Sequence, residues 1–291
     1  MKKLVSCLVA VFIAACLCSL AVAETPAFTE EVVTLHAENY DIPATVCLPS
    51  GDGPFPAVVM LHGTGSTRDE AGDGYAYAAP VLAEEYGLAT IRIDFPGNGD
   101  STADYMLYTF QSAVRDAKVA AEYMAGLDKI DGDRIGVMGW SQGGTDALLA
   151  CAWEPETFKS LVTWAGAPDL SDMMPDELYE EAKENGFFVM EFDFRTPLNV
   201  SLEWCNDVKN TDVLAEFARG YHGPVLAIAG TADDTVDPEW SNRIVASSEN
   251  HASRTFFIEG MDHTFSVFSG DLTNLYTAIR ATGEYFAETL K

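Results

Sequence analysis

Apolar and polar residues alternate in blocks along this chain, and the blocks have two characteristic lengths. Short apolar runs bounded by turn-forming residues are typical of buried strands, as in 56–61, 88–93 and 134–138. Longer segments with apolar residues three and four positions apart are typical of helices, as in 75–86 and 109–124. Strands that alternate with helices of this length predict a mostly parallel sheet with helices on both faces.

The beginning of this pattern differs from the rest. Residues 31–36 and 42–48 alternate apolar and polar side chains, which predicts an antiparallel pair at the edge of the sheet. The regular alternation then continues to the end of the chain, with strands predicted at 158–164, 224–229 and 254–258 and a last helix at 272–290.

One long segment interrupts the alternation. It holds an acidic, helix-like stretch at 176–184 and an apolar stretch with several phenylalanines at 187–194. The segment is too long and too structured for a loop. It is therefore predicted to be a cap inserted into the domain at about residues 168–223. Its phenylalanines line a substrate pocket on one interpretation and are ordinary packing on the other.

The first residues have the pattern of an export signal. A basic start is followed by an apolar run at 4–20 and by the small residues Ala21-Val22-Ala23. This predicts a signal peptide at 1–23, a mature chain of 24–291, and secretion or a periplasmic location. The run is a little short for a membrane span of about 20 residues, so no stable membrane insertion is expected after processing. Cys16 ends a lipobox-like sequence, which leaves a lipoprotein anchored at Cys16 as the alternative.

The mature chain is long enough for one large α/β domain, and it is strongly acidic. Asp and Glu number 45 against 17 Lys and Arg, which gives a formal net charge of -28. Such a chain repels nucleic acid and anionic lipid, so neither is an expected partner. Three of the six cysteines lie in the leader. The other three, which allow at most one internal disulfide and match no zinc-binding spacing, are Cys47, Cys151 and Cys205.

Gly139-Trp140-Ser141-Gln142-Gly143 is the most informative motif of the chain. It follows the predicted strand 134–138 and precedes a predicted helix at 144–150. A serine between two glycines on a sharp strand-to-helix turn is the geometry called a nucleophile elbow. The glycines allow a tight, strained backbone, and the helix directs its positive dipole end at an anion formed nearby. Ser141 is therefore the predicted nucleophile.

A serine hydroxyl needs a base to take its proton, and the base needs an acid to fix its tautomer. Of the five histidines, His263 follows the last predicted strand directly, at the sheet edge where active sites of open α/β sheets collect. It is the predicted base, and His62, in the turn after the third strand, is its rival. The acid should also follow a strand. Asp233 and Asp234 both follow 224–229, and spacing alone does not separate them.

Two backbone N–H groups are normally needed to bind the oxyanion that forms when an acyl group is attacked. Gln142, the residue after the nucleophile, is predicted to supply one of them. The turn His62-Gly63-Thr64-Gly65 supplies the other, most simply through Thr64. This chemistry requires neither a metal nor an organic cofactor, and none is predicted.

Together these motifs resemble the α/β-hydrolase superfamily over nearly all of the mature chain. Within it the chain is similar to the bacterial feruloyl and cinnamoyl esterases that carry an inserted cap. The resemblance implies an α/β-hydrolase fold and the acid Asp233, which precedes Val236 by three residues. Thr64 stands where that group often has an aromatic residue. The segments that carry the resemblance are His62-Gly63, 92–101, 139–144, 230–233 and Asp262-His263.

The function predicted from these observations is that of a secreted serine hydrolase. It cleaves a small-molecule or polysaccharide-linked carboxylic ester through an acyl-enzyme, with feruloyl and cinnamoyl esters as one substrate class. A peptidase of the prolyl-oligopeptidase type shares the motif order but usually carries a propeller domain for which this chain is too short. An acyltransferase would use an alcohol in place of water. A non-catalytic binding protein would have a broken triad, whereas every position here is filled. Cap geometry sets acyl and alcohol specificity, so the motifs do not choose the ester.

Overall fold

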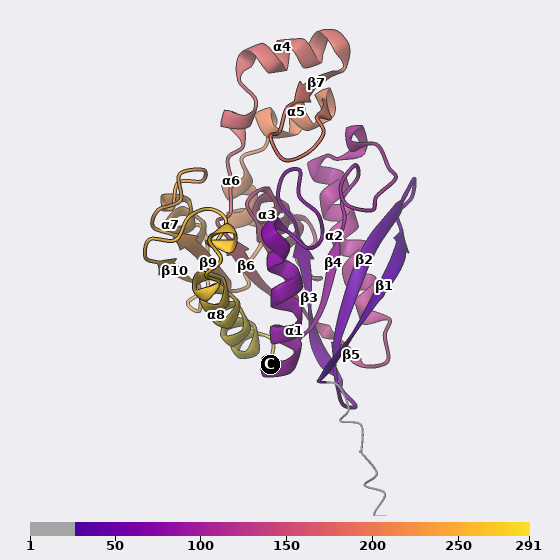
Figure 1. Cartoon of the computed structure of the whole chain (residues 1–291), viewed down its shortest axis with the longest axis vertical. Helices are drawn as coiled ribbons and strands as arrows, with labels where there is room; N and C mark the ends of the chain where they lie inside the picture. Colours follow the sequence, from indigo (N-terminus) through magenta and orange to yellow (C-terminus); the bar gives the residue numbers. More distant parts are fainter. Residues whose placement is uncertain (1–26) are drawn as a thin grey trace, which may run out of the picture.

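The computed structural model describes residues 27–291 (Figure 1). The predicted signal peptide and Cys16 lie outside the described residues. An eight-stranded sheet runs through the domain. In spatial order its strands are β1 (Phe28–His36), β2 (Asp41–Pro49), β4 (Ala89–Ile93), β3 (Phe55–Leu61), β5 (Ile130–Trp140), β6 (Ser160–Trp164), β9 (Val225–Gly230) and β10 (Arg254–Ile258).

The sheet is antiparallel at one edge and parallel elsewhere. β1 pairs with β2, and β2 with β4, in antiparallel register. The neighbours from β4 through β10 are all parallel. The antiparallel edge pair and the mostly parallel sheet predicted from the sequence are both confirmed. In a parallel sheet of this kind the carboxyl ends of the strands lie along one edge, where functional residues collect.

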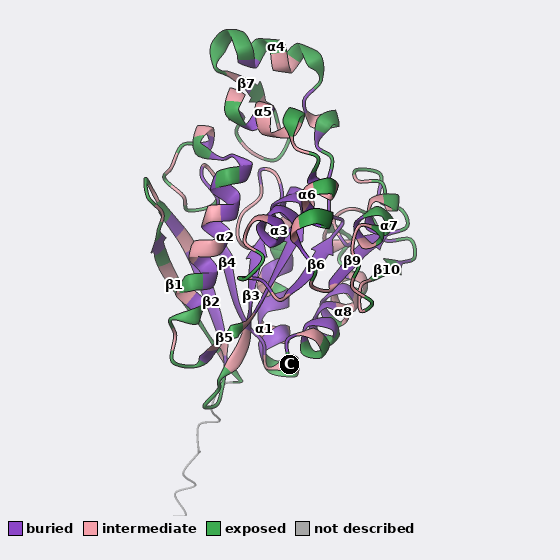
Figure 2. Cartoon of the chain, turned by 180° about the vertical axis from the view of Figure 1, so that it is seen from behind, coloured by how far each residue is buried: buried purple, intermediate pink, exposed green. Residues whose placement is uncertain are grey.

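Helices cover both faces of the sheet, so two buried cores form (Figures 1 and 2). Along β3, Ala57, Val59 and Leu61 face one core, whereas Val58 and Met60 face the other, as the two-residue period of a strand requires. One face is covered by α1 (Gly74–Tyr86) and α8 (Thr273–Thr289), and the other by α2 (Phe110–Ala125), α3 (Gln142–Trp153), α6 (Val213–Gly220) and α7 (Glu239–Ala246).

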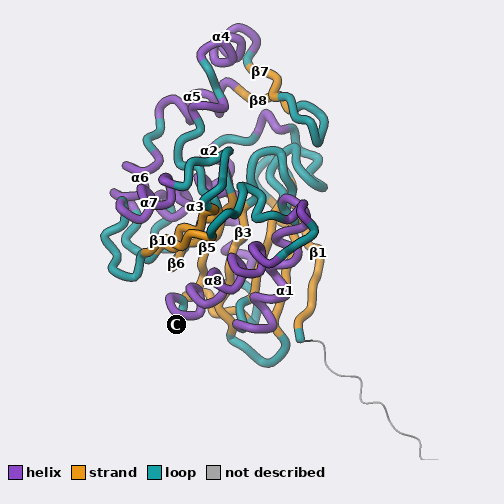
Figure 3. Tube along the Cα trace, turned by 60° about the vertical axis from the view of Figure 1, so that its left-hand side comes forward, coloured by secondary structure: helices purple, strands orange, loops and turns teal. Residues whose placement is uncertain are grey.

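The segment between β6 and β9 rises above the carboxyl edge of the sheet (Figures 1 and 3). β7 and β8 form an antiparallel hairpin, an element that the apolar stretch at 187–194 did not by itself predict. We call the part from η3 to α5 the insertion. Its elements are η3 (Ser171–Met173), α4 (Asp176–Asn185), β7 (Phe187–Met190), β8 (Leu198–Ser201) and α5 (Leu202–Asn210).

The last helix of the predicted cap, α6, packs against α3 in the body of the domain. A Cβ on Gly220 would overlap the carbonyl oxygen of Ala152, so the two backbones are in close contact. Trp153 Nε1 also donates a hydrogen bond to Glu216 Oε2 at 3.2 Å. Within the predicted range 168–223, α6 therefore belongs to the helical layer of the body, and the insertion above the sheet ends at α5.

Two further properties concern the described residues as a whole. Cys47, Cys151 and Cys205 are free and buried, so no disulfide joins them. Among the helices within residues 27–291, none combines the length and the apolar character that crossing a membrane requires.

Two carboxyl groups are buried between α2 and α3. Tyr40 donates a hydrogen bond to Asp116 Oδ2 at 2.7 Å, and Tyr108 donates one to Asp146 Oδ2 at 2.6 Å. Burial raises the pKa of Asp116 to about 7 and the pKa of Asp146 to about 8. Asp146 Oδ1 has no hydrogen-bond partner within the described structure.

These pKa shifts predict that the free energy of unfolding falls as the pH rises. An unfolded aspartate releases its proton near pH 4, whereas folded Asp116 and Asp146 hold theirs until about pH 7 and 8. The contribution of each of these carboxyl groups to the free energy of unfolding is complete below pH 4. Between pH 4 and the folded pKa it falls, by up to about 1.4 kcal/mol per pH unit for each group. In urea unfolding between pH 5 and 8.5, Asp146→Asn should flatten this slope, and Asp52→Asn, at an exposed position, should not. Equal slopes for wild type and Asp146→Asn would refute the assignment.

Candidate active site

Ser141 occupies the sharp turn between β5 and α3. Its backbone angles, φ 56° and ψ -122°, lie in a region that residues with a side chain rarely adopt. Close backbone contacts require both flanking glycines, since a Cβ on Gly139 would overlap the carbonyl oxygen of Gly143 and one on Gly143 would overlap that of Leu61. The N–H of Ser141 donates to the carbonyl oxygen of Trp164 at 2.9 Å. The turn therefore holds the hydroxyl at the N-terminus of α3.

His263 lies in the loop after β10, and its ring bridges Ser141 and an acid. Its Nε2 is 3.1 Å from Ser141 Oγ, and its Nδ1 is 2.9 Å from Asp233 Oδ2. An ionised carboxylate only accepts hydrogen bonds, so Nδ1 carries the proton and Nε2 presents its lone pair to the serine hydroxyl. The structure thus brings together the predicted residues Ser141, His263 and Asp233, which we call the triad.

Hydrogen bonding separates the two aspartates that spacing left open. The side chain of Asp233 is buried, and its Oδ1 accepts the N–H groups of Thr235 and Val236, both at 2.9 Å. This leaves Oδ2 directed at His263. Asp234 is exposed, and among residues 27–291 its carboxylate accepts one hydrogen bond, from the hydroxyl of Thr235 at 3.5 Å. Asp233, and not its neighbour, is therefore the acid beside the histidine.

Buried aromatic residues support the loop that carries His263. Phe265 packs between Trp140 and Trp164, with ring centroids 4.8 and 4.9 Å away. Trp140 Nε1 also donates to the carbonyl oxygen of His263 at 3.1 Å. Trp140 is only 2 % exposed, so it packs in the core and supports this loop.

His62 lies beneath the turn after β3, and both of its ring nitrogens are occupied. Its Nε2 accepts the N–H of Phe95 at 3.1 Å, and its Nδ1 donates to the carbonyl oxygen of Gly63 at 2.8 Å. Burial lowers the pKa of His62, so the ring is neutral. It has no free nitrogen with which to take a proton from Ser141, and it is therefore not an alternative base.

Thr64 and Gln142, the two predicted oxyanion residues, are joined by a hydrogen bond from Thr64 Oγ1 to Gln142 Oε1. Within residues 27–291, the backbone N–H of Thr64 donates to no protein acceptor. Gln142 is the first residue of α3, where helix N–H groups have no partner inside the helix. Its side-chain Nε2 is buried without a hydrogen bond in the described structure. Two N–H groups are thus available beside Ser141.

Glu70 is a part of the site that the sequence analysis missed. It is buried, and its carboxylate accepts the N–H groups of Gly63 and, at 2.8 Å, of Ala71. Burial raises the pKa of Glu70. In the sequence it follows Arg68-Asp69, and a run of charged residues is typical of a solvated surface. No feature of the neighbouring sequence distinguishes Glu70 from an exposed residue on such a surface.

The insertion reaches down to the same turn through Arg195. One guanidinium nitrogen donates to the carbonyl oxygen of Gly65 at 2.9 Å, and another donates to that of Gly97 at 2.9 Å. Phe192 lies against Gly65, where an added Cβ would be 3.0 Å from its ring. Phe188, by contrast, is buried within the insertion. The phenylalanines of the insertion therefore serve both in packing and in contact with the turn.

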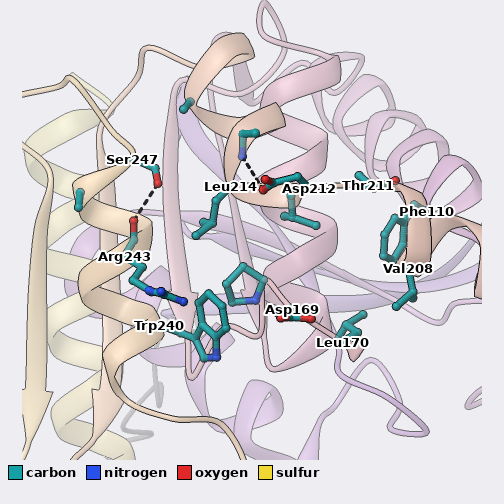
Figure 4. Close-up of a pocket in the computed structure, with 15 residues that line it drawn as sticks. Phe110, Asp169, Leu170, Val208, Thr211, Asp212, Leu214, Trp240, Arg243 and Ser247 are labelled. Atoms are coloured by element: carbon teal, nitrogen blue, oxygen red, sulfur yellow. Dashed lines mark hydrogen bonds between the residues drawn. The ribbon is translucent and has the colours of Figure 1, made fainter. Parts of the chain in front are cut away.

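A groove of about 700 Å³ is lined mainly by residues of α5, α6 and α7 and of the segments beside them (Figure 4). Its wall includes the buried ring of Phe110 and the indole of Trp240, over which the Arg243 guanidinium lies at 4.6 Å from the ring centroid. Asp169 and Asp212 also line the groove (Figure 4). No triad residue lines this groove. Within the described residues, no group of three or more His, Cys, Asp or Glu is placed to hold a metal ion.

Comparison with solved structures identifies the fold. Est1E from Butyrivibrio proteoclasticus with bound ferulic acid superimposes with a TM-score of 0.71, over 88% of this chain and 98% of that one, at 22% identity. The predicted α/β-hydrolase fold is confirmed. At this identity the similarity to Est1E is one of fold.

The chain is also similar in sequence to two known proteins, each over part of its length. The chain is 31% identical over 239 residues to the 2,6-dihydropseudooxynicotine hydrolase of Paenarthrobacter nicotinovorans, covering 78% of this chain and 59% of that protein. It is 35% identical over 105 residues to the quorum-quenching protein AidA of Acinetobacter baumannii, covering 36% and 33%. The chain thus spans 59% of the length of the first relative and 33% of the length of the second.

The model of the prolyl oligopeptidase family matches residues 77–267. This range includes all three triad residues and the whole insertion, and it leaves out Thr64 and Glu70. The match extends over more than half of the sequence. The chain belongs to the prolyl oligopeptidase family, and its fold is that of the α/β-hydrolases.

Proposed function

We propose that this hydrolase cleaves carboxylic esters through an acyl-enzyme formed on Ser141. The observation that carries the proposal is the continuous hydrogen-bonded series from Asp233 Oδ2 through His263 to Ser141 Oγ, with links of 2.9 and 3.1 Å. His263 accepts the hydroxyl proton while the serine oxygen forms a bond to the ester carbonyl carbon. Asp233 holds the histidine in the required tautomer and stabilises its cation.

The oxyanion that results is bound by two N–H groups and by the positive end of a helix. The backbone N–H groups of Thr64 and Gln142 donate to it, and α3 points its N-terminus at it. His263 then gives its proton to the departing alcohol oxygen as the carbon–oxygen bond breaks. A water molecule, deprotonated by the same histidine, attacks the acyl-enzyme and releases the acid and the serine.

The substrate is a small-molecule or polysaccharide-linked ester, and feruloyl or cinnamoyl esters are the aromatic class to test first. The fold similarity to Est1E with bound ferulic acid supports this choice, as does the aromatic ring of Phe192 that the insertion places on the turn. The signal peptide predicted from the sequence supports a location outside the cytoplasm for this reaction.

Family membership makes peptidase activity the second candidate, since the matching family is that of prolyl oligopeptidase. A panel assay separates the two. Residues 24–291 would be assayed with nitrophenyl acetate, butyrate and octanoate, with methyl ferulate and methyl coumarate, and with a proline nitroanilide. We expect turnover of esters with an initial burst of alcohol, and little cleavage of the anilide. Preferred cleavage of the anilide would favour the peptidase.

Two further outcomes of the same panel are informative. Turnover of aliphatic but not hydroxycinnamoyl esters would remove the feruloyl assignment and leave the esterase proposal standing. Formation of a new ester when an acceptor alcohol is added, in place of the free acid, would identify an acyltransferase.

A further inference from the structure

Glu70 combines two features that are costly in a folded protein. It is a buried carboxylate, and within residues 27–291 no ion pair joins it to a cation, because Arg68 pairs with Asp94 and Arg92 pairs with Asp69. Burying an unpaired charge is unfavourable. Its backbone also has a φ of 64° and a ψ of -177°, a conformation that is strained for a residue with a side chain. Strain of this kind is typical of functional sites.

The hydrogen bonds of Glu70 lead directly to the nucleophile. Its Oε1 accepts the N–H of Gly63, and Gly63 lies against the serine, since an added Cβ would be 3.1 Å from Ser141 Cβ. The carbonyl oxygen of Gly63 is held as well, by His62 Nδ1 at 2.8 Å and by the N–H of Ser66 at 3.2 Å. Both polar groups of this one residue are therefore fixed by the surrounding protein.

Fixing Gly63 also fixes the next N–H along the chain. The carbonyl group of Gly63 and the N–H of Thr64 belong to one planar trans peptide and point in opposite directions. With the carbonyl directed at His62, the N–H of Thr64 points away from that ring, and it has no protein acceptor in the described structure. Such an unoccupied donor, held in a fixed direction, is what binding of a developing oxyanion requires.

We propose that Glu70 is a positioning residue for the oxyanion turn: it holds Gly63 so that the N–H of Thr64 faces the oxyanion. The inference rests on the proposed function of Thr64. Within the described structure Glu70 makes no hydrogen bond to Ser141 or His263, so it acts through the turn and not on the transferred proton. The role requires an ionised carboxylate, because a neutral carboxamide would direct a donor at one of the two N–H groups.

The test compares Glu70→Gln with Glu84→Gln, a control at an exposed glutamate of α1. Active sites are counted with a fluorophosphonate, and kcat and KM are measured on the best ester of the panel. Loss of an oxyanion donor costs about 100- to 1000-fold. Misdirecting one should lower kcat per active site by about 10- to 100-fold and change KM by less than about threefold. The inhibition constant of a trifluoromethyl ketone, whose adduct carries an oxyanion, should rise by the same factor as kcat falls.

The outcomes separate this inference from the proposed function. A folded Glu70→Gln variant that loses active sites or thermal stability but keeps wild-type kcat per site and inhibitor affinity would overturn it, because Glu70 would then be structural only. If the wild type hydrolyses no ester, the ester proposal fails. The rate at which the fluorophosphonate labels Ser141 then becomes the readout, since that reaction also uses the turn, and Glu70→Gln should slow it about 10- to 100-fold.

A second variant covers the case in which Glu70→Gln does not fold. Glu70→Asp keeps the charge but shortens the side chain by one methylene, so its carboxylate no longer reaches both N–H groups. We expect a smaller loss of kcat per site than for Glu70→Gln, again with little change in KM. Wild-type kcat and inhibitor affinity in Glu70→Asp would count against the proposed role.

Discussion

Replacing Ser141 with alanine should lower kcat by about 10⁶-fold, the largest effect that any single change in this chain is expected to have. In the proposed mechanism the hydroxyl oxygen, 3.1 Å from His263 Nε2, is the atom that forms the acyl-enzyme, and alanine offers no group to replace it. The residual rate, about 10³- to 10⁴-fold above that in water, would come from substrate binding and the oxyanion donors. The measurement is kcat on the best ester of the panel, together with fluorophosphonate labelling of the protein.

Ser171→Ala provides the matched control, because Ser171 is an exposed serine of the insertion. It should leave both kcat and labelling unchanged. Activity that persists at the wild-type level in Ser141→Ala would disprove the whole mechanism, including the roles of His263 and Asp233. Activity that disappears in both variants would show that the assay is reporting on folding.

Asp233→Asn should lower kcat by about 10⁴-fold, the second largest effect. In the wild-type protein one oxygen of the Asp233 carboxylate accepts the Nδ1–H of His263 at 2.9 Å. The N–H groups of Thr235 and Val236 hold the other oxygen. If the carboxamide NH₂ faces the ring, it favours the tautomer whose Nε2 carries the proton. That nitrogen can no longer accept a proton from Ser141. The substitution preserves size and most packing, so the thermal midpoint should change little.

Asp234→Asn is the natural comparison, since it changes the adjacent and chemically identical residue. Asp234 is exposed and bonds to Thr235, not to the ring of His263, so we expect kcat within about twofold of wild type, as for surface substitutions in general. Equal losses in the two variants would mean that negative charge near the loop matters and that the specific hydrogen bond to His263 does not.

Much of this architecture is predictable from the sequence because it depends on local chemistry. The alternation of 56–61 and 75–86 reflects strands and helices whose faces are buried, and the glycines around Ser141 reflect a turn with no room for side chains. His263 is predictable because it directly follows a strand, and parallel strands end at one edge of the sheet. In each of these cases the neighbouring residues in the chain carry the information.

The rest depends on contacts between distant segments. Asp233 and Asp234 are not separated by spacing alone, and in the folded protein they differ in burial and in the two backbone N–H groups that Asp233 accepts. Glu70 resembles a surface residue because its partner, Gly63, is held in place by a turn that forms only in the folded protein. The position of α6 in the body likewise depends on its contact with α3, which no local pattern in the chain specifies.

The contact that Arg195 makes has a consequence for engineering this protein. Its guanidinium group leaves the insertion and binds carbonyl oxygens in two separate loops of the body, at Gly65 and at Gly97. The insertion is therefore not an independent module that sets specificity alone. A chimera that receives the corresponding segment of a relative needs a guanidinium group at the same place, or it loses a support of its own active-site loop together with the old specificity.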